Sequence, residues 1–526
     1  MRGRAGVNKY PERTDVVIVG SGAAGSLMAV KLSKSGKKVI ILEAGPIRKP
    51  GDLISSQIHA RRLKWSGEPV EETGAQPIGN VFNSGYGTGG SALHHYGVWP
   101  RLHAEDFKVK SLYGRALDWP ITYDDLRPSY DQIQQEVGIS GDKAREIWRP
   151  DGADYPLPPV PVFQQGEIIA GGFKKLGKSI SPLPLALNSR DYKDRPACLW
   201  DGWCDAGCPT GALANPLALY LPQTEKQGGK IIHNATVSRI LTDDGGKKAI
   251  GVIYHADDGT EITQMAHMVI LAAFAVQTPR LLLNSADGGL ANRSGLVGAN
   301  IMSHAAATVY GLFNEEMEPY MGATGGQLLN QDSYDHKDKR TKGFGSYQWM
   351  IAQAVKPNDL LGFGGTNPAL FGPKLTEFMQ QAAQHFGGMT GCVEDLPVQE
   401  NRITLSSDKD KYGIPLPTAD HASHKDSYAL WQAAKEEGTE IFKAAGATHI
   451  WNGPLGPMHI MGGTIMGDKA EKSVTNSYGQ CHDIDNLFIA GPGLFPTCGG
   501  VNPTFTVHAL TLRSSKYILK NWPAIT

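Results

Sequence analysis

Long apolar runs, an excess of one charge and abundant cysteine are all missing from this 526-residue sequence. No uninterrupted apolar stretch approaches the roughly eighteen residues that span a bilayer, so we expect no transmembrane segment. The 51 basic and 52 acidic residues leave a formal net charge of -1, too little to attract phosphate backbones, and nucleic acid is not an expected partner. Six cysteines are too few for a disulfide scaffold, so a local group of them is better explained as reactive or metal-bound.

A secretory signal is also missing from the amino terminus. The opening MRGRAGVNKYPERTD contains arginines but no apolar run behind them, and the first apolar run, VVIVG, suits a buried strand. We therefore expect no signal peptide belonging to this chain. Glycine and proline, by contrast, are plentiful at 63 and 33 residues, which predicts a folded, loop-rich protein.

A βαβ unit is predicted at the start of the chain. The pattern gives a strand at Asp15–Val19, a glycine turn, a helix at Ala23–Ser35 that stops at Gly36, and a strand at Lys38–Leu42. The turn matches the dinucleotide fingerprint G-x-G-x-x-G, in which the glycines allow a tight turn, close approach of a pyrophosphate and close packing of helix on strand. The acid after the second strand is placed to accept a hydrogen bond from a ribose hydroxyl. The expected cofactor contacts are Gly20, Gly22, Ala23, Ala24, Gly25 and Glu43.

Two further stretches favour an extended, buried cofactor, and hence FAD over NAD. One is the glycine-rich FNSGYGTGGSALHHYGVWPR, Phe82–Arg101. The other is near the carboxyl terminus, where a strand at Asn486–Ala490 leads to a helix beginning near Asn502 and Pro503. The amino terminus of that helix could face a flavin ring.

With these stretches the sequence resembles the glucose-methanol-choline (GMC) family of FAD oxidoreductases from the fingerprint to the last helix. Gly89-Gly90-Ser91 looks like the family's second glycine motif, beside the isoalloxazine. FAVQTPRLLLNSA is similar to the family's second signature, with Phe274 where glycine or serine is usual and Ala286 where glycine is usual. MHIMGGTIMG, Met458–Gly467, looks like the family's segment of a histidine followed by a glycine-threonine turn.

The resemblance implies the residues of the chemistry. Oxidation of an alcohol needs a base for the hydroxyl proton, and His459 matches the family's catalytic histidine. Asn502 stands where relatives have histidine or asparagine, and its amide can donate to the substrate oxygen. His508, further along the same helix, is interpreted as structural.

His94 raises a separate question about the flavin. The order Gly89-Gly90-Ser91-Ala92-Leu93-His94 reproduces the spacing at which choline oxidase and pyranose 2-oxidase attach flavin through a histidine. A covalent 8α-histidyl FAD and a non-covalent lining role for His94 are given equal weight. Val237, in the middle of the chain, is also expected to contact the cofactor.

Half of the six cysteines are crowded into RPACLWDGWCDAGCPTGALANP, as Cys198, Cys204 and Cys208. Zinc prefers four ligands and closer pairs, and a disulfide plus one free thiol leaves the spacing and the proline unexplained. Short thiolate spacings that end in Cys-Pro resemble the ferredoxin run, so we predict an iron-sulfur cluster. Trp200 and Trp203 either shield this cluster from water or simply pack in the loop. A fourth ligand would have to come from Cys392, Cys481, Cys498, Asp201 or Asp205.

Within the family, the cysteine motif and SLYGRALDWPITYDDLRPSYDQIQQEVGISG look most like the catalytic large subunits of bacterial sugar dehydrogenase complexes, which act on glucose, fructose, gluconate or glucosides. That resemblance implies a 3Fe-4S cluster, a small accessory subunit, and a c-type cytochrome or other electron acceptor. It implies a periplasmic or membrane-associated location through partner subunits, with a cytoplasmic one as the alternative.

The expected fold is α/β: a Rossmann-like FAD-binding domain and a discontinuous sheet-plus-helix substrate domain. A sugar site needs aromatic faces and donors, which Tyr347, Gln348 and Trp349 could supply, although such stripes more often belong to a core. The predicted division is 12–101, 213–304 and 452–526 for the FAD-binding domain, 102–197 for a connecting segment, 198–212 for the cysteine-rich loop and 305–451 for the substrate-binding domain.

The expected function is therefore an FAD-dependent dehydrogenase that oxidises a hydroxyl of a sugar, glycoside or sugar acid and releases electrons singly through an iron-sulfur cluster. One alternative is an oxygen-using alcohol oxidase with zinc or no metal at the cysteines. Another is a flavin-bound structural or sensing subunit without catalysis.

Overall fold

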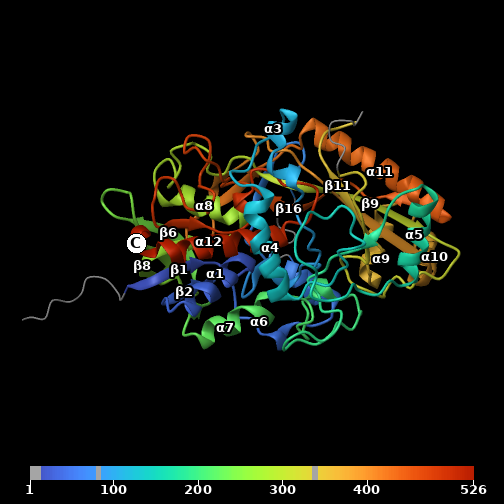
Figure 1. Cartoon of the computed structure of the whole chain (residues 1–526), viewed down its shortest axis with the longest axis horizontal. Helices are drawn as coiled ribbons and strands as arrows, with labels where there is room; N and C mark the ends of the chain where they lie inside the picture. Colours follow the sequence, from blue (N-terminus) through green and yellow to red (C-terminus); the bar gives the residue numbers. More distant parts are fainter. Residues whose placement is uncertain (1–12, 65, 79–83, 335–341) are drawn as a thin grey trace, which may run out of the picture.

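Two sheets of seven described strands each lie toward opposite ends of the molecule (Figure 1). The computed structural model describes residues 13–64, 66–78, 84–334 and 342–526. Residue 12, at the start of the predicted FAD-binding domain, and residues 82 and 83, at the start of the predicted glycine-rich stretch, lie outside this part of the chain. None of the helices in the described part is both long and apolar enough to cross a bilayer.

The predicted βαβ unit is confirmed. It consists of β1 (Thr14–Val19), α1 (Ala23–Lys34) and β2 (Val39–Leu42), and the two strands pair in parallel with Val16 opposite Val39. The β1 side chains from Val16 to Ile18 are fully buried, as expected for a parallel strand covered on both faces.

The first sheet has the order β5-β2-β1-β8-β7-β6, with β17 beside β8. The pairs around β1 and β8 are parallel, except that β6, β7 and β8 form an antiparallel meander. The added strands are β5 (Lys230–Ile232), β6 (Thr236–Thr242), β7 (Ala249–His255), β8 (Glu261–Leu271) and β17 (Leu487–Ile489).

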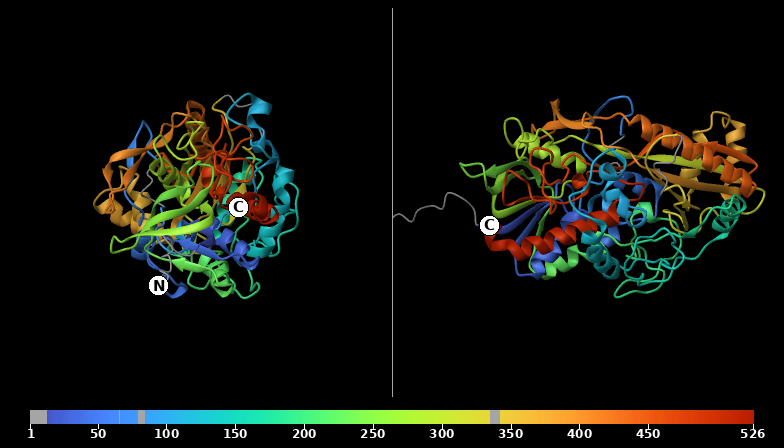
Figure 2. Two further views of the ribbon diagram at one scale, coloured as in Figure 1. Left: turned by 90° about the vertical axis from the view of Figure 1, so that its left-hand side faces the viewer. Right: turned by 45° about the horizontal axis from the view of Figure 1, so that its top comes forward.

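The carboxyl-terminal helix α12 (Thr504–Ile525) covers this sheet together with α1, and it also packs against α4 (Tyr123–Val137) (Figure 2). Its amino-terminal cap is Pro503, as the sequence predicts. Shorter helices complete this half: α2 (Gln57–Lys64), α3 (Val109–Tyr113), α6 (Pro216–Leu219) and α7 (Leu221–Lys226).

The second sheet is antiparallel, with the order β15-β9-β12-β11-β10-β4 and with β16 beside β9. Helices α5 (Gln164–Lys175) and α11 (Lys425–Ala445) pack on one face, and α9 (Pro357–Gly365) and α10 (Pro373–His385) lie against the other. Its strands are β4 (Ser181–Pro182), β9 (Met302–Leu312), β10 (Leu328–Asn330), β11 (Tyr347–Ile351), β12 (Phe386–Val393), β15 (His449–Asn452) and β16 (Gly456–Met461).

A small third sheet joins β13 (Arg402–Lys409), β14 (Pro415–Asp420) and β3 (Glu71–Thr73), and α8 (Phe274–Ser285) packs between it and β6. Strands β11 and β13 belong to different sheets, because β11 pairs with β12 and β13 pairs with β14. The domain division stays a prediction, although β4 and β16 join the second sheet from outside 305–451.

Candidate active site

A cavity of about 550 Å³ is lined by residues of both large sheets. Its wall runs from the glycine turn after β1 to the segment around residue 94, the start of α8, strands β9 and β12, and the residues that precede α12. Gly25 and Gly89 do not line the cavity. Gly25 packs against the Gly20 carbonyl, and the Gly89 N–H donates to the Ser21 hydroxyl. Of the predicted site residues, those on the wall are Gly20, Gly22, Ala23, Ala24, Glu43, Gly90, Ser91, His94, Val237, His459 and Asn502.

The fingerprint glycines are required by the geometry of the turn. Gly20 has a φ of +99°, and a Cβ on Gly25 would lie 2.0 Å from the Gly20 carbonyl oxygen. At Gly22 a Cβ would meet only the Gly89 oxygen at 3.9 Å, so this position opens onto the cavity. The turn therefore leaves room for a phosphate-bearing cofactor at a helix amino terminus, and these residues fit FAD.

Glu43 ties two glycine-rich segments together. One carboxylate oxygen accepts from the Ser21 backbone N–H at 3.0 Å and from its hydroxyl at 2.6 Å. The other accepts from the N–H groups of Gly45 at 3.0 Å and Gly87 at 3.2 Å. The Ser21 hydroxyl in turn accepts from the Gly89 N–H at 3.1 Å. Glu43 thus anchors the loops around the cavity, and its contact with a ribose stays a prediction.

His94 offers the cavity an uncommitted ring nitrogen. Its Nε2 is buried and has no hydrogen-bond partner among the described residues. The neighbouring His95 is engaged, since its Nε2 lies 2.6 Å from the Ala214 oxygen. Burial lowers the pKa of His94 to about 3 and that of His95 to about 4, so both rings are neutral.

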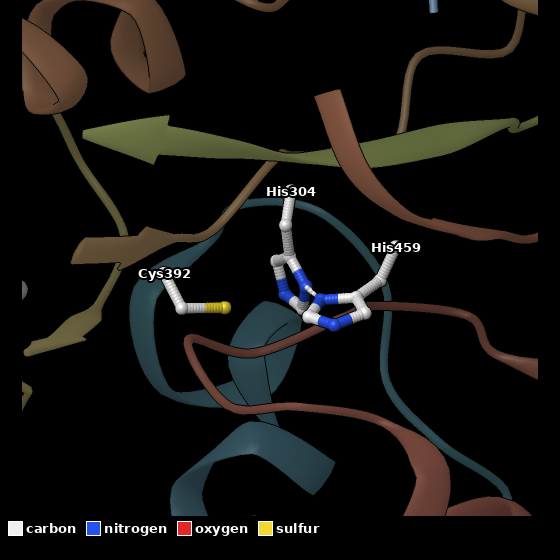
Figure 3. Close-up of side chains that lie close together, drawn as sticks. All are labelled: His304, Cys392 and His459. Atoms are coloured by element: carbon white, nitrogen blue, oxygen red, sulfur yellow. Dashed lines mark hydrogen bonds between the residues drawn. The ribbon is translucent and has the colours of Figure 1, made fainter. Parts of the chain in front are cut away.

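His459 and His304 face one another beside the cavity (Figure 3). Their Nδ1 atoms are 3.0 Å apart, and the Nε2 of His304 lies 2.7 Å from the Gly499 carbonyl oxygen. Burial lowers the pKa of His459 well below 6.5, and the neighbouring His304 adds to this effect. Burial also lowers the pKa of His304 to about 4, although its hydrogen bond to the Gly499 carbonyl opposes the shift.

These contacts decide where the protons are. A carbonyl only accepts, so His304 must carry its proton on Nε2 and present a bare Nδ1. His459 then donates its own Nδ1–H to that atom, which leaves the Nε2 of His459 as a free base. This nitrogen lies 3.3 Å from Nδ2 of Asn502. The predicted base therefore has the required tautomer, held by two groups behind it.

The orientation of Asn502 is also fixed. Its Oδ1 accepts from Nε2 of Gln348 at 2.8 Å, and Gln348 in turn accepts from Nε2 of Gln331 at 2.9 Å. Both glutamines are buried, so this chain of amides turns the Asn502 NH₂ group toward His459. A substrate oxygen placed there would meet one base and one donor.

Sequence reasoning did not identify His304, and it named Cys392 only as a possible fourth ligand of the cluster. His304, Cys392 and His459 place ligand atoms within 4.8 Å of one another, and Cys392 points toward the histidine pair (Figure 3). Because the histidine nitrogens are engaged in hydrogen bonds, acid-base chemistry explains this group better than a metal ion does. For Gln348, a polar residue within the apolar run YQWMI, the sequence offered a usable signal. For His304 it offered none, because the register of β9 against β16 could not be read from the sequence.

Of the three residues proposed for a sugar site, only Gln348 faces it. Tyr347 and Trp349 point to the opposite side of β11, where the Tyr347 hydroxyl and the Trp349 N–H both donate to Glu437. Alternate residues of a strand face opposite sides, which explains the split. The two aromatic residues belong to the core, which is the interpretation that the sequence favoured for such a stripe.

The cysteine loop stands against the cavity wall. It lies between α2, whose Lys64 forms an ion pair with Asp205, and the segment 320–324, where Gly322 donates to the Trp200 oxygen at 3.0 Å. Asp205 lines the cavity. Cys198, Cys204 and Cys208 share one apolar cluster with Tyr96 and Met458.

The sulfur atoms of this loop receive hydrogen bonds. The backbone N–H of Trp200 donates to Cys198 at 3.4 Å, and that of Leu213 donates to Cys208 at 3.5 Å. Burial raises the pKa of Cys198 to about 12 and that of Cys204 to about 11, so without a bound cation both are neutral thiols. Trp200 packs with the cysteines, whereas Trp203 lies beneath the Lys356 ammonium at 5.0 Å.

The spacing of the three thiols bears on what they can bind. They are not all within 4.8 Å of one another, whereas two thiolates on one zinc ion, at about 2.3 Å each, are separated by less than that. The loop therefore does not favour a single zinc ion, and the iron-sulfur cluster stays a prediction. Among the candidates for a fourth ligand, Cys481 and Cys498 lie in the core of the first sheet, Asp205 is paired with Lys64, and Cys392 shares the apolar cluster of the loop.

Comparison with known protein families gives three matches. A GMC oxidoreductase description matches residues 159–306 and again 397–511, and an FAD binding domain matches residues 15–49. Among solved structures, formate oxidase has a similar fold, with a TM-score of 0.71 at 16% identity over 98% of this chain and 100% of that one.

Curated relatives cover nearly the whole chain. The fructose dehydrogenase large subunit of Gluconobacter japonicus is 30% identical over 96% of this chain and 98% of its own length. The 2-methyl-1,2-propanediol dehydrogenase of Mycolicibacterium austroafricanum is 32% identical over 98% of this chain and 96% of its own length. The gluconate 2-dehydrogenase flavoprotein of Pantoea cypripedii is 27% identical over 97% of this chain and 94% of its own length.

Proposed function

This chain belongs to the GMC oxidoreductase family, as an FAD-dependent enzyme of alcohol or sugar substrates, and on that premise we propose that it is a dehydrogenase rather than an oxidase. It oxidises a hydroxyl of a sugar, glycoside or sugar acid to a carbonyl and delivers electrons to a one-electron acceptor protein. The observation that carries the proposal is the cysteine loop, with its three clustered thiols, against the wall of the cavity.

The chain's own residues handle the proton. Nε2 of His459 accepts the substrate hydroxyl proton, and the Asn502 NH₂ group donates to the same oxygen as negative charge builds on it. The imidazolium that forms keeps its Nδ1–H bond to His304, which spreads part of the charge to a second ring. The Gly499 carbonyl holds that ring in place.

FAD would be held by the glycine turn at Gly20–Gly25, by Gly90 and Ser91, and by Val237. When bound, FAD supplies the hydride acceptor. We further propose a covalent bond from Nε2 of His94, supported by the absence of any partner for that atom among the described residues. Acid denaturation should leave the flavin on the wild-type chain and release it from His94→Ala. Complete release from the wild type would refute the covalent bond.

Cys198, Cys204 and Cys208 would hold a 3Fe-4S cluster, supported by their spacing and by the N–H groups aimed at two of the sulfurs. Such a cluster supplies one-electron transfer. The similarity to a relative named as a large subunit supports a small accessory subunit, and we propose a c-type cytochrome as acceptor and a periplasmic or membrane-associated location.

The proposal is tested by iron and acid-labile sulfide analysis of the purified protein, with dye reduction measured in parallel. We expect iron and sulfide in the wild type, loss of both in Cys204→Ser, and retention in Cys481→Ser, a buried cysteine outside the loop. A wild type that lacks iron and rapidly forms peroxide in air would instead establish the oxygen-using oxidase.

A further inference from the structure

We propose that the cavity selects uncharged polyhydroxy substrates over hydroxy acids, and that the Asp359 carboxylate is the group that excludes the acids. This inference rests on the proposed function, because it narrows the substrate of the same site. It is carried by the arrangement of charge along the cavity wall.

The second sheet provides a trough that leads away from the base. Register places Cys392 opposite Ala306, Thr390 opposite Thr308, and Gly388 opposite Tyr310. All of these except Cys392 line the cavity, and Cys392 lies beside His459. At about 3.4 Å per residue, the row from Cys392 to Gly388 is roughly 14 Å long, which accommodates a molecule of sugar size.

The middle of this trough carries uncharged polar groups. The Thr390 hydroxyl donates to Oε1 of Gln353 at 2.5 Å, and Nε2 of Gln353 donates to the Thr324 carbonyl at 3.3 Å. Thr308 and Thr324 add further hydroxyls to the wall. Such groups can exchange hydrogen bonds with substrate hydroxyls, but they do not neutralise a carboxylate.

Asp359 stands at the outer end of the trough, on α9. On the same helix Phe363 stacks on Tyr310 with ring centroids 4.5 Å apart. The Asp359 carboxylate accepts from the Lys356 backbone N–H at 2.9 Å and from the Gln57 amide at 3.3 Å, with no ion-pair partner in the described part of the chain. Burial raises its pKa, and the nearby Lys64 opposes this shift only in part.

The nearby cations, Lys64 and Lys356, offset this carboxylate only in part, because each is engaged with other groups. Arg280, the arginine of the described lining, is paired with Asp410 at 2.7 Å. Lys64 is paired with Asp205, and the Lys356 ammonium is bound to the carbonyl oxygens of Asp201 and Tyr320. The lining histidines are neutral because burial lowers their pKa values.

The consequence for substrates follows from desolvation. A carboxylate that enters this trough would lose water without gaining a cation and would face Asp359. A neutral hydroxyl at the same place would donate to Asp359 and to the amide and hydroxyl oxygens. The trough therefore favours sugars, glycosides and simple polyols over sugar acids.

The test compares matched neutral and acidic alcohols by anaerobic bleaching of the flavin, which does not depend on the electron acceptor. The pairs are D-glucose with D-glucuronate and glycerol with glycerate. In the wild type we expect the neutral member of each reactive pair to react at least about tenfold faster per unit concentration. In Asp359→Asn the ratio should fall toward one, since the amide keeps an oxygen for the Lys356 N–H and removes the charge.

Glu377→Gln makes the same charge change on an exposed residue of α10 and should leave the ratio unchanged. If Asp359→Asn does not fold, Thr390→Lys provides a cation within the trough and should raise the rate with D-glucuronate. Acids that react as fast as their neutral partners in the wild type, or an unchanged ratio in a folded Asp359→Asn, would overturn the inference. Reaction with the acids alone overturns it and leaves the proposed function standing, whereas no flavin bleaching by any alcohol means that the proposed function itself has failed.

Discussion

His304→Leu is the substitution that tests the proton arrangement most directly. His304 is fully buried and does not line the cavity, and it contacts the predicted base directly. Leucine fills a similar space but provides no acceptor for the Nδ1–H of His459. The base must then either keep an unsatisfied buried donor or move its proton to Nε2, where it can no longer accept one from the substrate.

The size of the effect follows from the geometry. An unsatisfied buried donor costs about 1–3 kcal/mol, which corresponds to a fall in kcat of about 5-fold to 150-fold. His304→Asn retains an acceptor oxygen near the position of Nδ1, so its loss should stay below about tenfold. Both variants act on the orientation and the tautomer of the His459 ring, so the readout is kcat at a pH where the histidines are neutral.

The assay is steady-state dye reduction over a range of pH, with flavin content measured for each variant. His508→Asn is the matched control, since His508 is another buried histidine with a pKa lowered to about 4 that bonds to the Thr504 carbonyl rather than to His459. Wild-type kcat in His304→Leu would refute the assignment, and so would equal damage from leucine and asparagine.

Three further outcomes are expected. Gly25→Ala should lose bound FAD, measured as the ratio of flavin to protein, because its Cβ would lie 2.0 Å from the Gly20 oxygen; full flavin content would contradict the turn geometry. The free energy of unfolding should fall as pH drops from 6.5 toward 4, by about 1.4 kcal/mol per pH unit for each neutral buried histidine that must gain a proton on unfolding; a flat profile in denaturant titrations would exclude this cause. The histidines with pKa lowered to about 4 are His95, His304 and His508. Lys64→Met should destabilise by about 3–5 kcal/mol, because it leaves Asp205 buried and unpaired at 6% side-chain exposure, and adding Asp205→Asn should recover most of that loss in urea melts.

The local parts of the fold could be predicted from the sequence. The βαβ unit, the cap of α12 at Pro503 and the glycine positions follow from turn chemistry within a few residues, so the pattern predicts them closely. The resemblance of short motifs to a known family also pointed to His459 and Asn502, which lie side by side in the structure, and their catalytic roles stay a prediction.

The parts that depend on distant segments could not be predicted. His304 meets His459 across 155 sequence positions through the register of β9 with β16, and hydrophobic patterns do not encode such a register between separate strands. Asp359 reaches the trough because α9 packs on the face of the sheet that carries Tyr310 and Phe386. Alternation separates Gln348 from Tyr347 and Trp349, but it does not tell which face of β11 is turned toward the site.

The predicted base and the amide beside it belong to different sheets of the molecule. His459 lies on β16, which pairs with β9 of the second sheet. Asn502 precedes α12, which covers the first sheet. Their 3.3 Å contact therefore depends on the relative position of the two sheets. In a chimera that takes its second sheet and β16 from a relative, the donor half would bring its base and the recipient would keep its amide. The activity of that chimera would depend first on whether His459 and Asn502 keep their contact, and only then on its new substrate contacts.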